Sequence, residues 1–130
     1  MPRPEHTRRI DERGSTTVEM VVALPVVLLV LFIAVQSGMW FYARSIALAA
    51  AETGARSSAA LNSTTQVGVA DAQGFVANIG GTTLTNVTVT GSRNATQATI
   101  TVTGNTIQLV PWLVLPVSQT ATLPLERYTR

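Results

Sequence analysis

The chain has 130 residues, a net charge of +2 and no cysteine, so it has room for one modest domain without disulfides or thiolate metal sites. All its basic residues are arginines, and no basic patch with interleaved aromatic residues occurs, which argues against a nucleic-acid partner. The one histidine, His6, lies near the N-terminus, and Glu52, Asp71 and Glu126 are too scattered to suggest a catalytic pair. We therefore expect neither enzyme activity nor a cofactor or metal.

The N-terminal part divides into a polar leader and a long apolar run. The leader, residues 1–14, carries Arg3, Arg8, Arg9 and Arg13. The run from Met20 to Ala43 has no charged residue, and about 20 apolar residues suffice to cross a bilayer core of roughly 30 Å. We expect a transmembrane helix at about residues 20–43. Because more arginines precede this run than follow it, the N-terminus should be cytoplasmic and the C-terminal domain extracytoplasmic.

Three interpretations of this apolar run are open. An ordinary secretory signal has an apolar core of only about 7–15 residues, and here its cleavage site would fall late, at Ala47-Leu48-Ala49. The run can also be an uncleaved signal anchor in a single-pass membrane protein. The third interpretation is a pilin precursor, and it depends on the residues just before the run.

The segment Gly14-Ser15-Thr16-Thr17-Val18-Glu19 resembles the cleavage motif of type IV prepilins. Extended to Leu24-Pro25, Trp40-Phe41-Tyr42-Ala43-Arg44 and Gly54-Ala55-Arg56, it resembles the TadE-like family, which comprises minor pilins or pseudopilins of tight-adherence pilus systems. The resemblance covers roughly residues 12–60, and Thr53 departs from the Arg-Glu-Gly-Ala-Arg pattern that is more usual there. It implies a function in pilus assembly, with a prepilin peptidase cutting between Gly14 and Ser15. The implied partners are that peptidase, other pilins or pseudopilins, and membrane lipid.

Glu19 is the only charge between Arg13 and Arg44. A carboxylate costs about 2.5–3.5 kcal/mol at the centre of a membrane helix and less near its edge, so its presence needs a reason. The resemblance implies an assembly role, in which the α-amino group freed at Ser15 of one subunit pairs with Glu19 of a neighbour. Thr16 and Glu19 also fit a capping box at a helix start, and the helix dipole favours an acid there. The two roles can coexist.

A single long helix is predicted from Ser15 to about Leu61, a length of roughly 70 Å. Pro25 should kink it within the membrane. Trp40, Phe41 and Tyr42 should form an aromatic belt at the outer interface.

Beyond this belt, small residues recur at spacings of three and four along one face of the predicted helix. This small-residue stripe consists of Ala43, Ala47, Ala50 or Ala51, Gly54 and Ser58. It can pack against other pilin helices or against the protein's own sheet. Ala47, Gly54 and Arg56 are the candidate helix-packing residues, and Arg56 also stands four residues after Glu52 in a favourable ion-pair orientation.

Residues 62–130 are predicted to form a small extracytoplasmic α+β domain. Asn62-Ser63-Thr64-Thr65 ends the long helix, and Val67–Ile79 reads as a short amphipathic helix that ends at Gly80-Gly81. Three sets of alternating apolar residues follow among threonines: Leu84, Val87 and Val89; Ala98, Ile100 and Val102; Val117, Ala121, Leu123 and Leu125. Asn86 interrupts the first set, and Gly91-Ser92-Arg93-Asn94 supplies a turn after it. Because threonine and valine favour strands, we expect a three-stranded antiparallel sheet with one apolar face packed on a helix.

The segment Ile107–Leu115 is highly apolar but too short to span a membrane, and Pro111 and Pro116 exclude a central strand. It should cover the sheet, or dip into the membrane interface through Trp112, or contact a partner. Two functions are open for the whole chain. One is a pilus-assembly subunit processed by a prepilin peptidase, and the other is an uncleaved, surface-anchored module that binds an unknown ligand through its sheet.

Overall fold

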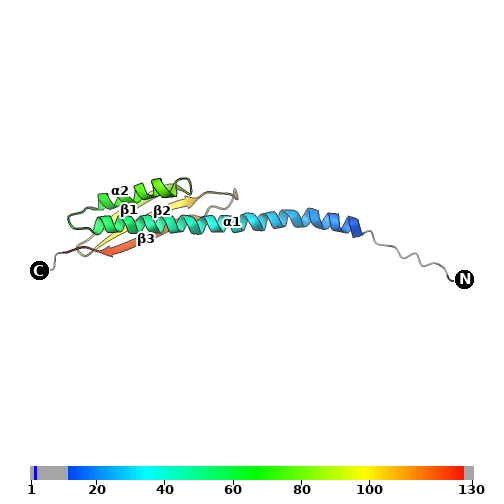
Figure 1. The fold of residues 1–130 in the computed structure, drawn as a ribbon, viewed down its shortest axis with the longest axis horizontal. Helices are drawn as coiled ribbons and strands as arrows, with labels where there is room; N and C mark the ends of the chain where they lie inside the picture. The colour runs from blue at the N-terminus through cyan, green and yellow to red at the C-terminus, as the bar shows by residue number, and fades with distance from the viewer. Residues whose placement is uncertain (1, 3–11, 128–130) are drawn as a thin grey trace.

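The computed structural model describes residues 2 and 12–127, and it consists of one long helix with a small sheet and a second helix packed along its C-terminal half (Figure 1). The elements in chain order are α1 (Glu12–Ala59), α2 (Thr65–Phe75), the π-helical turn η1 (Val76–Gly80), β1 (Leu84–Arg93), β2 (Gln97–Thr106) and β3 (Pro116–Pro124). This confirms the predicted α+β fold. The N-terminal half of α1 extends beyond the rest of the fold with no other element beside it (Figure 1).

Helix α1 begins at Glu12 rather than at Ser15 and ends at Ala59. Thr16 therefore lies inside the helix, and the predicted capping box does not mark its start in this uncleaved chain. The helix is continuous through Pro25, so the kink predicted there stays a prediction. Asn62 adopts a left-handed conformation, with φ of 58°, and the chain turns away from the helix there. This position lies in the segment that was predicted to end the helix.

Helix α2 runs back along α1 (Figure 1). Thr64 caps it, because its side chain accepts a hydrogen bond from the backbone N–H of Val67. The helix widens into η1 and ends at Gly81, whose φ of 43° a residue with a side chain would rarely adopt. The short helix predicted at Val67–Ile79 is thus confirmed, with its start two residues earlier, at Thr65.

The sheet has the strand order β1-β2-β3, and both neighbouring pairs are antiparallel. The apolar residues predicted for the second strand, Ala98, Ile100 and Val102, are all fully buried on one face. In β1 the register shifts between Thr85 and Thr88, where Asn86 has a φ of 52°, so the predicted interruption is a β-bulge.

The predicted turn at Gly91–Asn94 is wrong, because Gly91 lies inside β1 and pairs with Ile100. A Cβ atom at Gly91 would lie 2.7 Å from Cγ2 of Thr65, so the glycine is needed for the close approach of α2 and not for a turn. The turn follows at Asn94, whose Oδ1 accepts hydrogen bonds from the backbone N–H groups of Thr96 and Gln97.

The core lies between α1, α2 and the inner face of the sheet, and its fully buried members include Ala47, Ala72 and Ile100.

The outer face of the sheet carries hydroxyl side chains. Thr99 and Thr122 share a hydrogen bond of 3.0 Å across β2 and β3 on this face. This face has no other described element over it and meets solvent in the single chain, as alternation along the strands requires.

Candidate functional site

Helix α1 has two halves that differ in burial. All residues from Ser15 to Val35 are exposed, and the apolar window of this helix contains no buried residue. At about 1.5 Å per residue, this stretch of about 21 residues is roughly 32 Å long. It is long and apolar enough to cross a bilayer core. The last part of the predicted span at 20–43 is not uniformly exposed, because Gln36 and Ala43 are fully buried in the domain.

The predicted cleavage and assembly residues lie at the free end of this exposed stretch. Gly14 and Ser15 are in the first turn of α1, and Glu19 follows one helical turn after Ser15 on the same side. Ser15 and Glu19 both border one shallow surface groove that is otherwise lined by apolar residues of the helix. Glu19 is exposed and forms no ion pair with any residue in the described part of the chain.

The small-residue stripe packs inside the protein. Ala47 and Gly54 are buried under the protein's own sheet and α2, which decides between the two predicted packing partners for the single chain. A Cβ atom at Gly54 would lie 2.6 Å from the carbonyl oxygen of Gly68 and 2.9 Å from Cβ of Ala72. The backbones of α1 and α2 therefore approach closely at Gly54 and Gly68, and a side chain at either position would push them apart.

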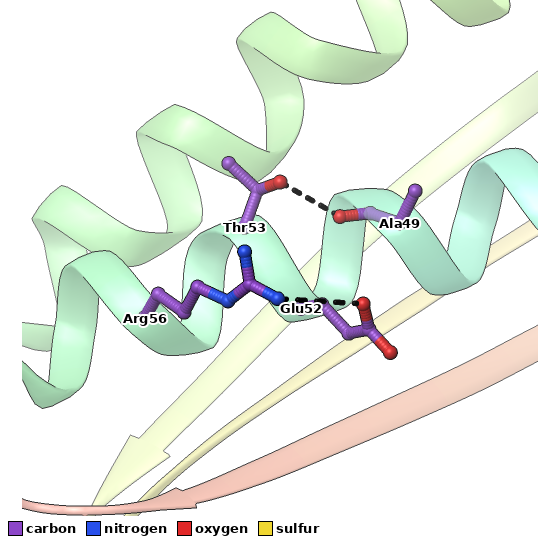
Figure 2. Close-up of polar contacts among 4 residues, drawn as sticks. All are labelled: Ala49, Glu52, Thr53 and Arg56. Carbon is purple, nitrogen blue, oxygen red and sulfur yellow. Dashed lines mark hydrogen bonds and ion pairs between the residues drawn. The ribbon is translucent and has the colours of Figure 1, made fainter.

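Arg56 lies outside this packed stripe. Its Nη2 atom is 4.0 Å from Oε2 of Glu52, and the two side chains are 75% and 48% exposed (Figure 2). Thr53, where the sequence departs from the family pattern, donates its hydroxyl to the carbonyl oxygen of Ala49 within the same helix (Figure 2). The ion pair is thus on the open surface of α1, where it contributes little to stability but is accessible to a partner.

Gln36 is a structural residue that the sequence analysis missed. Its Nε2 atom donates to the Thr106 hydroxyl at 3.2 Å and to the carbonyl oxygen of Ile107 at 2.9 Å. Its Oε1 atom accepts a 2.8 Å hydrogen bond from the backbone N–H of Leu109. The side chain is fully buried and fixes the start of the β2–β3 loop against α1. The signal in the sequence was an amide in the middle of an apolar run.

The apolar segment Ile107–Leu115 forms the loop between β2 and β3, at the end of the sheet that points toward the uncovered half of α1 (Figure 1). Val110 is buried, but Leu109, Trp112 and Val114 are 41%, 76% and 52% exposed. Only Val110 of this segment is buried, so most of the segment lies outside the core, and the three predicted contacts of the segment stay predictions.

The predicted aromatic belt is divided between the domain and the surface. Trp40 is half-buried, and its Nε1 atom donates a 3.1 Å hydrogen bond to the carbonyl oxygen of Pro116 at the end of the β2–β3 loop. The guanidinium of Arg44 lies 5.5 Å from the centre of the Trp40 ring. Phe41 and Tyr42 are exposed. Trp40 therefore joins α1 to the sheet, and only its two neighbours face outward.

Comparison with known proteins connects this helix with one family. Residues 14–56 match the model of the TadE-like protein family. Neither a curated protein nor a solved structure matches the chain. The match begins at Gly14 and ends at Arg56, so it covers the exposed half of α1 and the small-residue stripe up to Gly54, but not α2 or the sheet. Over these residues the resemblance to the TadE-like family is confirmed.

Proposed function

We propose that this chain is a minor pilin or pseudopilin that acts in the assembly of a tight-adherence pilus and has no catalytic role. In this proposal a prepilin peptidase removes residues 1–14 on the cytoplasmic side, and the domain after Val35 lies outside the membrane. The observation that carries the proposal is the isolated carboxylate of Glu19, which begins an exposed apolar helix just after Gly14 and lies within the family match.

The position of the Gly14–Ser15 bond supports cleavage. The bond lies in the first turn of α1, which begins at Glu12. The first four N–H groups of a helix have no acceptor within it, so the peptidase has few hydrogen bonds to break when it unwinds this turn. Glycine is also a poor helix former, by about 1 kcal/mol relative to alanine, which makes the turn easier to open.

The surroundings of Glu19 support a contact between subunits. In a membrane, the exposed helix surface around Glu19 would face lipid, where an unpaired carboxylate is costly. An α-amino group at Ser15 of a neighbouring subunit would satisfy it with a charge-assisted hydrogen bond. Glu19 is about 6 Å along the helix from Ser15, so two parallel helices would be offset by about one turn. Glu19 then sets the axial register of neighbouring subunits.

The test determines the N-terminus of the mature protein and measures its binding to the other pilus subunits. The full chain is produced together with the prepilin peptidase and the other pilus subunits, and mass spectrometry of the purified protein should give a chain that starts at Ser15. Glu19→Gln should leave cleavage and membrane insertion intact but lower co-purification with the other pilus subunits by roughly 10- to 100-fold. This range corresponds to the loss of a hydrogen bond between charged groups, about 1.5–3 kcal/mol.

Asp71→Asn is the control for this test, because Asp71 is also an exposed acid but lies on α2 and not on the open surface of α1. This control should co-purify like the wild type. If Glu19→Gln co-purifies with the other subunits as well as Asp71→Asn does, Glu19 has no role in assembly and this proposal is wrong.

A second candidate function is an uncleaved, single-pass surface module that binds a ligand through its sheet. The observation that favours it is the outer sheet face, where Thr101 and Thr120 share a 3.0 Å hydrogen bond and present hydroxyl groups to solvent. An intact N-terminus in cells with an active prepilin peptidase, together with no association with pilus subunits, would favour this alternative.

A further inference from the structure

The β2–β3 loop, Ile107–Leu115, concentrates apolar surface outside α1. In the part of the chain that the structure describes, the exposed large apolar side chains outside α1 are Val67, Ile79, Leu109, Trp112 and Val114. Three of them belong to this one loop, and Trp112 is the most exposed, at 76%. Scattered single apolar residues are normal on a soluble surface, but a group on one loop indicates a contact.

The loop is held at one defined height on α1. Its start is fixed by two hydrogen bonds of the Gln36 side chain, which donates to the carbonyl oxygen of Ile107 and accepts from the backbone N–H of Leu109. Its end is fixed by the hydrogen bond from Trp40 to Pro116. Since Gln36 follows directly after Val35, the loop stands where the uncovered stretch of α1 ends (Figure 1).

The length of the uncovered stretch relates this height to a bilayer. Ser15–Val35 is roughly 32 Å long, close to the hydrocarbon thickness of about 30 Å. If Ser15 lies at one edge of the hydrocarbon, Val35 lies at the other, and Gln36 with the loop lies at the headgroup level. Tryptophan prefers this layer, because its ring is apolar and its N–H group requires a polar partner.

We propose that the Ile107–Leu115 loop is a second membrane contact, in which Leu109, Trp112 and Val114 enter the interfacial lipid of the leaflet where α1 emerges. The proposal rests on the membrane-spanning helix of the proposed function but not on cleavage or on Glu19. A helix that spans alone can rotate about its axis, whereas a loop fixed to it by Gln36 and inserted beside it prevents this. The loop therefore sets both the height of the domain and the direction in which its sheet faces.

The experiment measures lipid contact at Trp112 in the full chain, reconstituted in phosphatidylcholine vesicles. Emission is compared in ordinary vesicles and in vesicles whose acyl chains are brominated near the headgroup end, because bromine quenches a tryptophan only at close range. The chain has two tryptophans, so the contribution of Trp112 is the difference between the wild type and Trp112→Phe. Trp40 stays intact in both proteins and keeps its hydrogen bond to Pro116.

The control moves a tryptophan to the far end of the domain, in Trp112→Phe combined with Val67→Trp. Val67 is exposed on α2, next to Gly68, which packs on Gly54 of α1. Position 54 is about 19 residues, or roughly 28 Å, beyond Val35 along the helix. A tryptophan at position 67 should emit as in water and should not be quenched by brominated lipid.

We expect the Trp112 emission to be shifted to shorter wavelength and to lose much of its intensity in brominated vesicles. If the protein floats with the vesicles but Trp112 is not quenched, the loop does not contact lipid and this proposal is wrong. The membrane helix of the proposed function would then remain intact. A blue-shifted but unquenched emission that depends on the protein-to-lipid ratio would assign the loop to contact with a second protein, and would also overturn the proposal. Protein that does not float with vesicles would contradict the membrane helix itself.

Discussion

The close approach of α1 and α2 at Gly54 predicts an unusual response to a substitution that normally stabilises a helix. Replacing a glycine inside a helix by alanine usually raises the free energy of unfolding by about 1 kcal/mol, because alanine has fewer backbone conformations in the unfolded chain. At Gly54, however, the new methyl group would lie 2.6 Å from the carbonyl oxygen of Gly68 and 3.3 Å from Cγ2 of Ile100. A backbone carbonyl cannot rotate away as a flexible side chain can, so the two helices must separate.

Overpacking of this kind costs about 1–3 kcal/mol, and it also disturbs the contact of α1 with the sheet at Ile100. After subtraction of the gain in helix propensity, we expect Gly54→Ala to lower the free energy of unfolding of the domain by roughly 1–2 kcal/mol. For a domain of this size, the melting temperature would fall by roughly 5–15 °C.

The assay is denaturant unfolding of the full chain in detergent micelles, followed by the fluorescence of Trp40 in a Trp112→Phe background. Gly74→Ala is the matched control, because Gly74 is inside α2 and a Cβ atom there would meet no other atom within 4 Å. The control should be more stable than the background by about 1 kcal/mol. If Gly54→Ala is stabilised as much as Gly74→Ala, the two helices do not pack at Gly54 and the reasoning is refuted.

Two further substitutions test buried polar groups of α1. Gln36→Leu removes the side-chain partner of the Ile107 carbonyl and of the Leu109 N–H group, and one of the two partners of the Thr106 hydroxyl. Amide hydrogen exchange at Leu109 should therefore become faster while the centre of β2 stays protected, and unchanged exchange at Leu109 would contradict the anchoring role. The Ser58 hydroxyl is buried without a hydrogen-bond partner in the described structure, so Ser58→Ala should leave stability unchanged or raise it by about 1 kcal/mol in the same unfolding assay. A clear loss of stability would show that this hydroxyl has a partner.

The strands were predictable because their pattern is local. In β2, Ala98, Ile100 and Val102 alternate with threonines, and only one register buries all three on the same face. The bulge at Asn86 was also readable, since asparagine tolerates a positive φ better than most residues and breaks the alternation there. Both features depend on neighbours in the sequence, so a single sequence contains the information.

Gly91 shows where such reasoning fails. A glycine followed by Ser92-Arg93-Asn94 has the composition of a turn, but its reason in the structure is the proximity of Thr65 and Val69 on α2. A contact between distant parts of the chain leaves no local signal in the sequence. The glycine was therefore assigned to a turn, which is the commoner reason for a glycine. The same limit applies to Gln36, whose partners are about 70 residues away in the sequence.

The apolar run of α1 was predicted as one membrane-facing unit, but the structure divides it at Gln36. Hydrophobicity alone could not show this, because lipid and a protein core are both apolar. Side-chain size distinguishes the two halves. Large residues such as Leu29 and Phe32 cover the stretch before Gln36, whereas alanines such as Ala43 and Ala47 follow it. Lipid adapts to large side chains, but a sheet must approach the helix closely and therefore requires small ones.

This division limits which surfaces another subunit can use. The small-residue stripe, the most obvious surface for helix packing, is already covered by the protein's own sheet and α2. If neighbouring pilins pack against α1 in the proposed assembly, they contact what remains open on this helix: the exposed stretch Ser15–Val35 with Glu19, and the surface around Glu52 and Arg56. The family match spans both of these surfaces, from Gly14 to Arg56. Substitutions that weaken assembly without unfolding the domain should consequently map to these two surfaces and not to the stripe.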